Sequence, residues 1–179
     1  MVHPLVTQLR FARSEFRRAL DGVTDEEARQ RFQPINAISW MVGHLAWQEQ
    51  RYWIFRPEGR FAVPELNDLV GFGAPASTPP LAEMWAAWET VTRAGDPFLD
   101  GLSAETLATH FVVDGQTDPE NIGTRLLRTT YHYWYHIGES QAVRQLLGHS
   151  DAGNFVGDIG DEAPWQANEA TAHADSSFG

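Results

Sequence analysis

The segment from Thr124 to His149 constrains the fold more than any other part of the sequence. It runs for about seven turns without a proline, and its one glycine before the final turn is Gly138. Apolar and aromatic residues occupy several sides of this segment, as expected of a helix that packs on more than one face. We therefore expect the rest of the chain to be organised around a long helix here.

Two histidines of this helix, His132 and His136, lie one turn apart on the same stripe. Imidazoles at this spacing can bind a single metal ion. However, the chain has seven histidines, and a pair at this spacing then arises by chance roughly one time in four. Arg125 and Glu139 fall on or close to the same stripe. The pair needs a third ligand before it indicates a metal site.

Three further segments have the apolar periodicity of helices. The first has apolar residues on one side and arginines on the other. The second begins near Asn36 or Ser39 and is predicted to end before Pro57, and the third follows a Pro-Pro pair. A capping box from Thr24 to Glu27 also predicts a short helix. The predicted long helices span residues 3–20, 39–55, about 80–95, and 124–149.

The segments between these helices differ in character. Residues 57–80 contain five prolines and several apolar residues, which is typical either of a lid or rim over a site or of a crossover loop packed on the bundle. Phe111–Val113 is predicted to be extended or irregular, and 114–121 to be rich in turns. Residues 1–165 are expected to form one domain, and 166–179 a disordered tail.

The composition excludes several classes of function. The formal net charge is −11, which argues against a nucleic-acid partner because such proteins need a basic face. There are no cysteines, so disulfides, thiolate zinc sites and a cysteine nucleophile are excluded. No apolar run reaches membrane-spanning length, and the N-terminus is typical of a helix rather than a signal peptide. A cytoplasmic protein is expected.

The candidate third ligand is His44, on the apolar face of the second helix beside Trp40 and Trp47. A histidine in such a place is more often a core residue bonded to a neighbour. Gln48 follows one turn later and Arg51 two turns later. Glu49 points away from this face, toward solvent or another helix. His3, His110 and His173 are interpreted as surface or terminal residues.

The second helix, WMVGHLAWQE, and the fourth, YHYWYHIGESQAVRQLLGH, together resemble the DinB-like (YfiT-type) family over roughly residues 1–165. The resemblance implies an all-α four-helix bundle that is often homodimeric. It also implies a divalent metal ion on three histidines that map onto His44, His132 and His136. In this sequence the bundle has a long connection between its second and third helices and an irregular C-terminal segment.

Three neutral imidazoles leave a divalent ion its full charge and an open coordination position, the arrangement of catalytic sites. Such an ion lowers the pKa of a bound water or coordinates a thiolate, and imidazole suits zinc and nickel equally. Some members of the similar family are transferases that use low-molecular-weight thiols such as mycothiol or bacillithiol. We therefore expect a metal-dependent thiol S-transferase or hydrolase acting on small electrophiles; the alternative is a non-catalytic metal-binding stress-response or binding protein.

The residues around the proposed ligands suggest supporting roles. Gln48 could orient a water or substrate. Arg51 or Arg125 could receive an anionic group, unless they pair with Glu139.

A homodimer is also expected. Trp134 and Gly138 lie opposite the histidine stripe, where a glycine beside a large aromatic residue suits close approach of a second copy. The alternative is that the same residues pack under the N-terminal helix or the 150–165 segment of their own chain.

Overall fold

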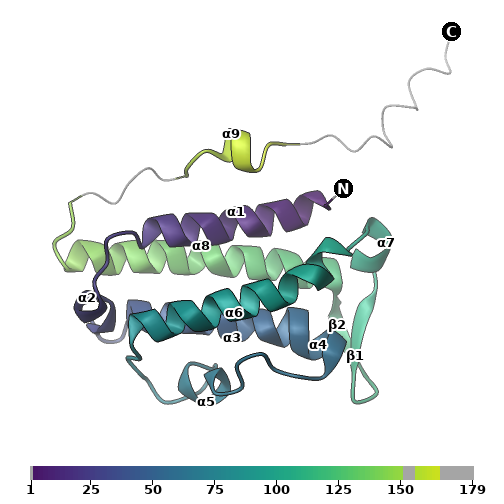
Figure 1. Cartoon of the computed structure of the whole chain (residues 1–179), viewed down its shortest axis with the longest axis horizontal. Helices are drawn as coiled ribbons and strands as arrows, with labels where there is room; N and C mark the ends of the chain where they lie inside the picture. Colours follow the sequence, from purple (N-terminus) through teal and green to yellow (C-terminus); the bar gives the residue numbers. More distant parts are fainter. Residues whose placement is uncertain (1, 151–155, 166–179) are drawn as a thin grey trace, which may run out of the picture.

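Four long helices form the body of the computed structural model, which describes residues 2–150 and 156–165. Helix α1 packs against α8, α3 packs against α6, and α3 also contacts α8, so two helix pairs are joined into one bundle (Figure 1). The predicted all-α class is confirmed, with one two-stranded sheet added. The bounds of the helices are α1 Pro4–Ala19, α3 Ile38–Gln50, α6 Leu81–Asp100 and α8 Ile122–Leu146.

The predicted capping box is present at the start of the short helix α2 (Asp25–Arg29). The Thr24 hydroxyl accepts from the Glu27 amide, and the Glu27 carboxylate accepts from the Thr24 amide. The Asp25 carboxylate accepts from the Leu81 amide at 2.7 Å. Helix α2 therefore caps its own first turn and, through Asp25, the first turn of α6.

The second long helix extends beyond its predicted end. It continues from α3 through a π-helical turn, η1 (Arg51–Phe55), and a last turn, α4 (Arg56–Glu58), so Pro57 lies within it. A proline lacks the amide hydrogen that a regular helix needs; here the helix widens before the proline, and the Arg56 guanidinium donates to the Arg51 carbonyl at 3.0 Å. Gly59 ends the helix in the left-handed region, with φ 71°.

Helix α6 also runs past its predicted end near residue 95, through Asp100, and includes Pro97. This proline lies in the last turn, so a single missing hydrogen bond does not end the helix.

The long connection between α3 and α6 packs on α3 instead of standing away from the bundle. It includes α5 (Leu66–Leu69). The Gln50 side chain both donates to and accepts from the backbone of Val63, at 3.0 Å in each case. Asn67 accepts from the Trp47 indole at 3.0 Å. Of the two interpretations left open above, the packed crossover describes this segment.

A β-hairpin occupies the region predicted to be extended and rich in turns. Strand β1 (His110–Val113) pairs antiparallel with β2 (Gln116–Asn121), with Val112 opposite Thr117. Asp114 and Gly115 connect them with φ of 51° and 74°, as a tight two-residue hairpin turn requires. Short helix α7 (Ala104–Leu107) precedes the hairpin, and α8 follows it directly.

Residues 156–165 lie beside α1 (Figure 1) and include α9 (Ile159–Glu162). Gln8 donates to the Ala163 carbonyl at 3.0 Å, and Ser14 donates to Glu162 at 2.7 Å. The tail predicted for 166–179 and His173 lie outside the described residues. None of the helices in the described ranges is long and apolar enough to cross a membrane.

A buried charge cluster joins the four long helices. Glu49 of α3 accepts from Arg13 of α1 at 2.8 Å and from the Tyr133 hydroxyl of α8 at 2.5 Å. Trp88 of α6 donates to that hydroxyl at 2.7 Å, and Arg13 also donates to Asp96 of α6 at 2.8 Å. The Glu49 charge therefore goes to another helix and not to solvent. We refer to these five residues as the Glu49 cluster.

Candidate metal centre

His44 lies in α3, where two tryptophans enclose its ring. The ring centroids of Trp40 and Trp47 lie 4.3 and 5.0 Å from that of His44, and both pairs are stacked. Gly43 lets α6 and the end of α5 approach, because a side chain there would meet Met84 of α6 and Val70, which follows α5. Packing and steric fit thus fix the imidazole in one orientation.

His132 and His136 lie on α8 and complete a group of three histidines with His44. One ring nitrogen from each lies within 4.8 Å of the other two. The Nε2 atoms of His132 and His136 are 3.0 Å apart. The i, i+4 spacing places the two imidazoles over one another on α8, and the contact of α3 with α8 brings His44 to them.

Hydrogen bonds at the second ring nitrogens set the tautomers of two of the histidines. His44 Nδ1 donates to the Val70 carbonyl at 2.7 Å, so Val70 fixes Nε2 as the free lone pair. His136 Nδ1 lies 2.8 Å from a carboxylate oxygen of Glu139 and donates to it, which leaves Nε2 of His136 free. Backbone carbonyls and carboxylates in this position are the usual outer partners of metal-binding histidines.

Burial keeps the imidazoles of His44 and His132 neutral. Loss of solvent lowers the pKa of His44 to about 4, against the smaller opposing effect of its hydrogen bond to Val70. Loss of solvent, followed by the nearby His136 and His44, lowers the pKa of His132 to about 3. Neutral imidazoles are the form that coordinates a metal ion, so these two residues need not lose a proton near neutral pH.

The arrangement fits a single divalent ion. The free Nε2 lone pair of His136 lies 3.0 Å from His132 Nε2, so the two atoms either share a proton in an N–H···N bond or turn both lone pairs toward one cation. Nitrogen ligands of a tetrahedral zinc ion lie roughly 3.3 Å apart, close to this spacing. His132 Nδ1 is buried without a hydrogen-bond partner, as expected when the ring is oriented by something other than its neighbours in the chain. The three histidines can therefore hold a metal ion.

An open cavity of about 610 Å³ on the α8 side has His132, one member of this group, in its wall. The outer face of α8 and one residue of α3 line this cavity. Trp40 and Trp47 enclose His44, and the 57–80 segment supplies the Val70 carbonyl. The lining residues are Gln48, Thr124, Leu127, Arg128, Tyr131, His132 and Tyr135.

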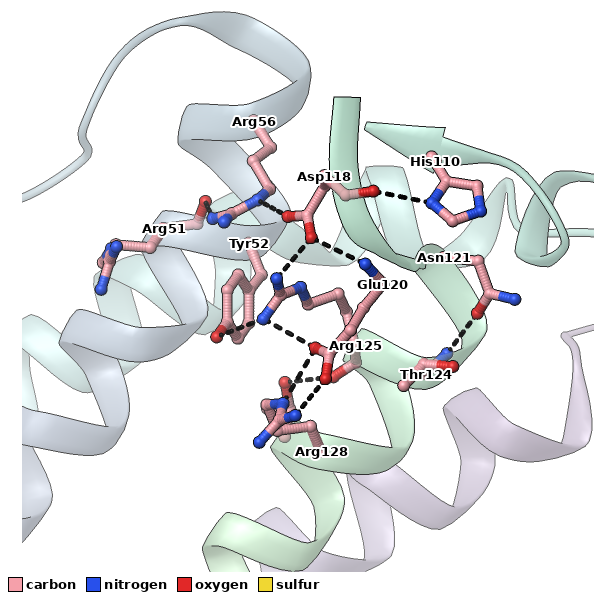
Figure 2. A network of polar contacts seen from close by, with 11 residues as sticks. Arg51, Tyr52, Arg56, His110, Asp118, Glu120, Asn121, Thr124, Arg125 and Arg128 are labelled. Atoms are coloured by element: carbon pink, nitrogen blue, oxygen red, sulfur yellow. Dashed lines mark hydrogen bonds and ion pairs between the residues drawn. The ribbon is translucent and has the colours of Figure 1, made fainter. Parts of the chain in front are cut away.

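Of the predicted supporting residues, Gln48 and Glu139 lie beside the histidine group, whereas Arg125 belongs to a separate network around Asp118. Gln48 shares the cavity wall with His132, and its Oε1 atom is buried without a partner. Glu139 bonds His136, so it pairs with neither arginine. The two terminal nitrogens of Arg125 bond Asp118, Glu120 and the Tyr52 hydroxyl, and its Nε atom is buried, so these groups already engage the guanidinium (Figure 2).

Sequence reasoning missed two features of this site. Val70 orients His44 through its backbone carbonyl, and no side-chain pattern marks such a role. Tyr131 and Tyr135 are exposed and line the cavity. Their spacing of four residues, on the face next to the histidine stripe, was the available signal.

The bundle and the histidine group together define a class: helical-bundle proteins with a metal site built from side chains on facing helices. A family model described as the DinB superfamily matches residues 8–140 of the chain. The protein belongs to the DinB superfamily, as the resemblance of the two histidine-bearing helices indicated. No curated protein matches the chain significantly.

Proposed function

We propose that this protein is a metal-dependent enzyme that joins a small thiol to a small electrophile. One observation carries the proposal: three imidazole nitrogens converge beside an open cavity. Within the described residues, the histidine group includes no fourth protein ligand. Three protein ligands with an accessible fourth position are typical of catalytic metal sites, whereas structural sites are closed by four.

Zinc or nickel is the proposed ion, since three imidazoles suit both. When bound, the ion supplies Lewis acidity that favours the thiolate form of a coordinated thiol at neutral pH. In the reaction, the sulfur forms a bond to the electrophilic carbon, the leaving group departs with its electron pair, and the thiol proton passes to solvent. The chain has no cysteine, so the nucleophile comes from a cosubstrate.

Gln48 has a defined task in this proposal. Its buried Oε1 atom is an unused acceptor in the cavity wall beside His132. An N–H or O–H group of an incoming substrate can satisfy it, which would orient the substrate toward the histidine group. The tyrosines Tyr131 and Tyr135 offer aromatic surface for the apolar part of the electrophile.

Two alternatives share the same site. A hydrolase would use water in place of the thiol as the nucleophile. A non-catalytic stress-response or binding protein would hold the ion and turn over nothing. The open cavity favours an enzyme over the second alternative.

The test begins with metal analysis of protein purified without an affinity tag. The metal-loaded protein is then incubated with a generic electrophile and either a panel of low-molecular-weight thiols or no thiol. Thioether formation that disappears in the His132→Ala variant supports the proposal. Product formation without any thiol would identify a hydrolase, and turnover of neither kind would favour the binding protein.

We also propose a homodimer. Trp134 is half-buried and packs on Phe11 of α1, with ring centroids 6.1 Å apart, so its contact is within the chain. Gly138 is exposed, and a methyl group added at this position would meet no atom within 4 Å, so this surface remains available to a second copy. Sedimentation at micromolar concentration tests the proposal; a monomeric mass would refute it.

A further inference from the structure

Arg51 differs from the other basic residues of the chain. All thirteen basic residues are arginines, and all of them lie in the described ranges. Most of these guanidinium groups bond a carboxylate or a carbonyl, and Arg31 and Arg93 are exposed to solvent. In residues 2–150 and 156–165, Arg51 is the one partly buried arginine whose guanidinium has neither an ion pair nor a hydrogen bond.

Arg51 lies on the same stripe of the second long helix as His44, one of the candidate metal ligands. Its guanidinium lies over the Trp47 ring, 4.6 Å from the centroid, and the same indole stacks on His44. Trp40, His44, Trp47 and Arg51 therefore form a column along one stripe of the second helix. Arg51 is seven residues from His44, which is about 10 Å along a helix axis. A small molecule of about this length can extend from Arg51 to His44.

The surroundings of Arg51 are positively charged. Burial lowers the pKa of Arg51, the nearby Tyr52 opposes this effect, and Arg56 and Arg125 lower the pKa further by repulsion. An unpaired, partly desolvated cation near two like charges is an unfavourable arrangement unless an anion occupies the site.

The nearby carboxylates do not relieve this charge. Asp118 is shared by Arg56 and Arg125, and Glu120 is shared by Arg125 and Arg128. Figure 2 shows the Arg51 guanidinium extending away from both carboxylates, with only its backbone carbonyl joined to the network. Local positive charge thus exceeds negative charge in a protein whose formal net charge is −11.

We propose that Arg51 binds a carboxylate at one end of the substrate whose other end reaches His44, His132 and His136. This inference rests on the proposed thiol chemistry and deepens it: the thiol cosubstrate is a mercaptocarboxylic acid, or a peptide-like thiol that ends in a carboxylate. The planar guanidinium fork matches a carboxylate with two parallel hydrogen bonds. The guanidinium already stacks on the Trp47 ring, so the Arg51 side chain loses little conformational freedom when the anion binds.

A series of thiols tests whether binding needs a carboxylate and how far that carboxylate lies from the sulfur. Metal-loaded protein is titrated with 3-mercaptopropionate, 8-mercaptooctanoate and 11-mercaptoundecanoate, and with the matching mercapto-alcohols. The acid should bind more tightly than the alcohol, by about tenfold or more, and mainly at the intermediate length. Arg51→Gln should abolish this preference, and leave binding of the alcohols unchanged.

The control variant is Arg93→Gln, which removes the same charge from an exposed position of α6. It should keep the preference of the wild-type protein. If Arg51→Gln and Arg93→Gln behave alike, or if the acid and the alcohol bind equally to the wild-type protein, the anchor is refuted. Because Arg51 has no ion pair to lose, Arg51→Gln should remain folded, which circular dichroism checks.

A second measurement separates failure of the anchor from failure of the thiol chemistry. The zinc-loaded protein is titrated with octanoate and, separately, with octanol, while the arginine Nε–H resonances are followed by NMR. Saturable movement of the Arg51 resonance with octanoate alone supports the anchor even when no thiol binds the ion. If thiols bind but octanoate leaves this resonance in place, the anchor is wrong and the proposed function stands.

Discussion

Helices α3 and α8 meet at two polar clusters that differ in one respect. In the Glu49 cluster, every side-chain nitrogen and oxygen of Arg13, Glu49 and Tyr133 has a partner within the chain. In the second, the histidine cluster of His44, His132, His136 and the adjoining Gln48, His132 Nδ1 and Gln48 Oε1 are buried without a partner. Neighbouring residues of one helix, His132 and Tyr133, belong to the two different clusters.

The difference separates a structural device from a binding site. A buried polar group without a partner costs roughly 1–3 kcal/mol, so a saturated cluster needs nothing further and an unsaturated one gains from a ligand. An isolated unpaired atom such as Trp53 Nε1 does not define a site. At the histidine cluster the unpaired atoms adjoin three converging nitrogens that could hold a metal ion.

The largest expected effect is the loss of metal from the histidine cluster. His132→Ala or His136→Ala should remove the stoichiometric ion, because two imidazoles bind a divalent ion far more weakly than three. Mass spectrometric metal analysis measures it. The bundle has its own apolar core, so the variants should keep their helical circular dichroism and melt at a lower temperature, since the stabilisation by bound ligand is lost.

His110→Ala is the matched control, because His110 lies in the hairpin and bonds the Asp118 carbonyl. It should keep the metal. Full metal content in both α8 variants would remove the distinction between the clusters, and unfolding on chelation would make the ion structural.

A substitution in the Glu49 cluster should instead lower the stability of the fold and leave the metal content unchanged. Glu49→Ala leaves the Arg13 guanidinium buried with only Asp96 as a partner, and should lower the free energy of unfolding by about 3–5 kcal/mol. Urea denaturation measures this. Metal content should remain stoichiometric, since Glu49 contacts none of the three histidines.

The double variant Arg13→Met, Glu49→Leu removes both charges and should recover most of the lost stability. A double variant that is as unstable as Glu49→Ala would show that the ion pair itself, and not the unpaired charge, determines the loss.

A smaller effect is expected at the boundary of the histidine cluster. Glu139→Gln keeps the size of the side chain but replaces the carboxylate that accepts from His136 Nδ1. Outer partners of this kind contribute about ten- to hundredfold in metal affinity. Competition with a chromogenic chelator measures that factor, and an unchanged affinity would show that Glu139 does not orient the ligand.

Much of this comparison was accessible from the sequence. The histidine spacing, the apolar periodicity and the capping box of Thr24 are local properties, and they predicted the helices and, with the family resemblance, the histidine group. Glu49 was placed toward solvent or another helix, but its partners could not be named, because Arg13 is 36 residues away in the chain.

The hairpin and the helix ends were harder to predict. Asp114-Gly115 between two β-forming segments is a hairpin signal, but it was interpreted only as a turn. Pro57 was taken as a helix end, whereas a π-helical turn accommodates it. Whether a proline ends a helix depends on how nearby backbone carbonyls are satisfied, here by the bond from the Arg56 side chain to the Arg51 carbonyl, which the apolar periodicity does not show.

The smallest expected effect concerns Asp118, which the unrecognised hairpin brings to the arginines. Burial opposes its ionisation, but hydrogen bonds from Arg125, the Glu120 amide and Arg56 outweigh this and lower the pKa of Asp118 to about 2. The unfolded chain has the ordinary value of about 3.9. Asp118 therefore contributes stability above pH 4 that is lost as the pH falls toward 2, about 1–2 kcal/mol of it between pH 4.5 and pH 2.5. Urea denaturation at pH 4.5 and pH 2.5 should show a smaller drop for Asp118→Asn than for the wild-type protein. Equal drops would mean that this third cluster does not hold its carboxylate in the charged form.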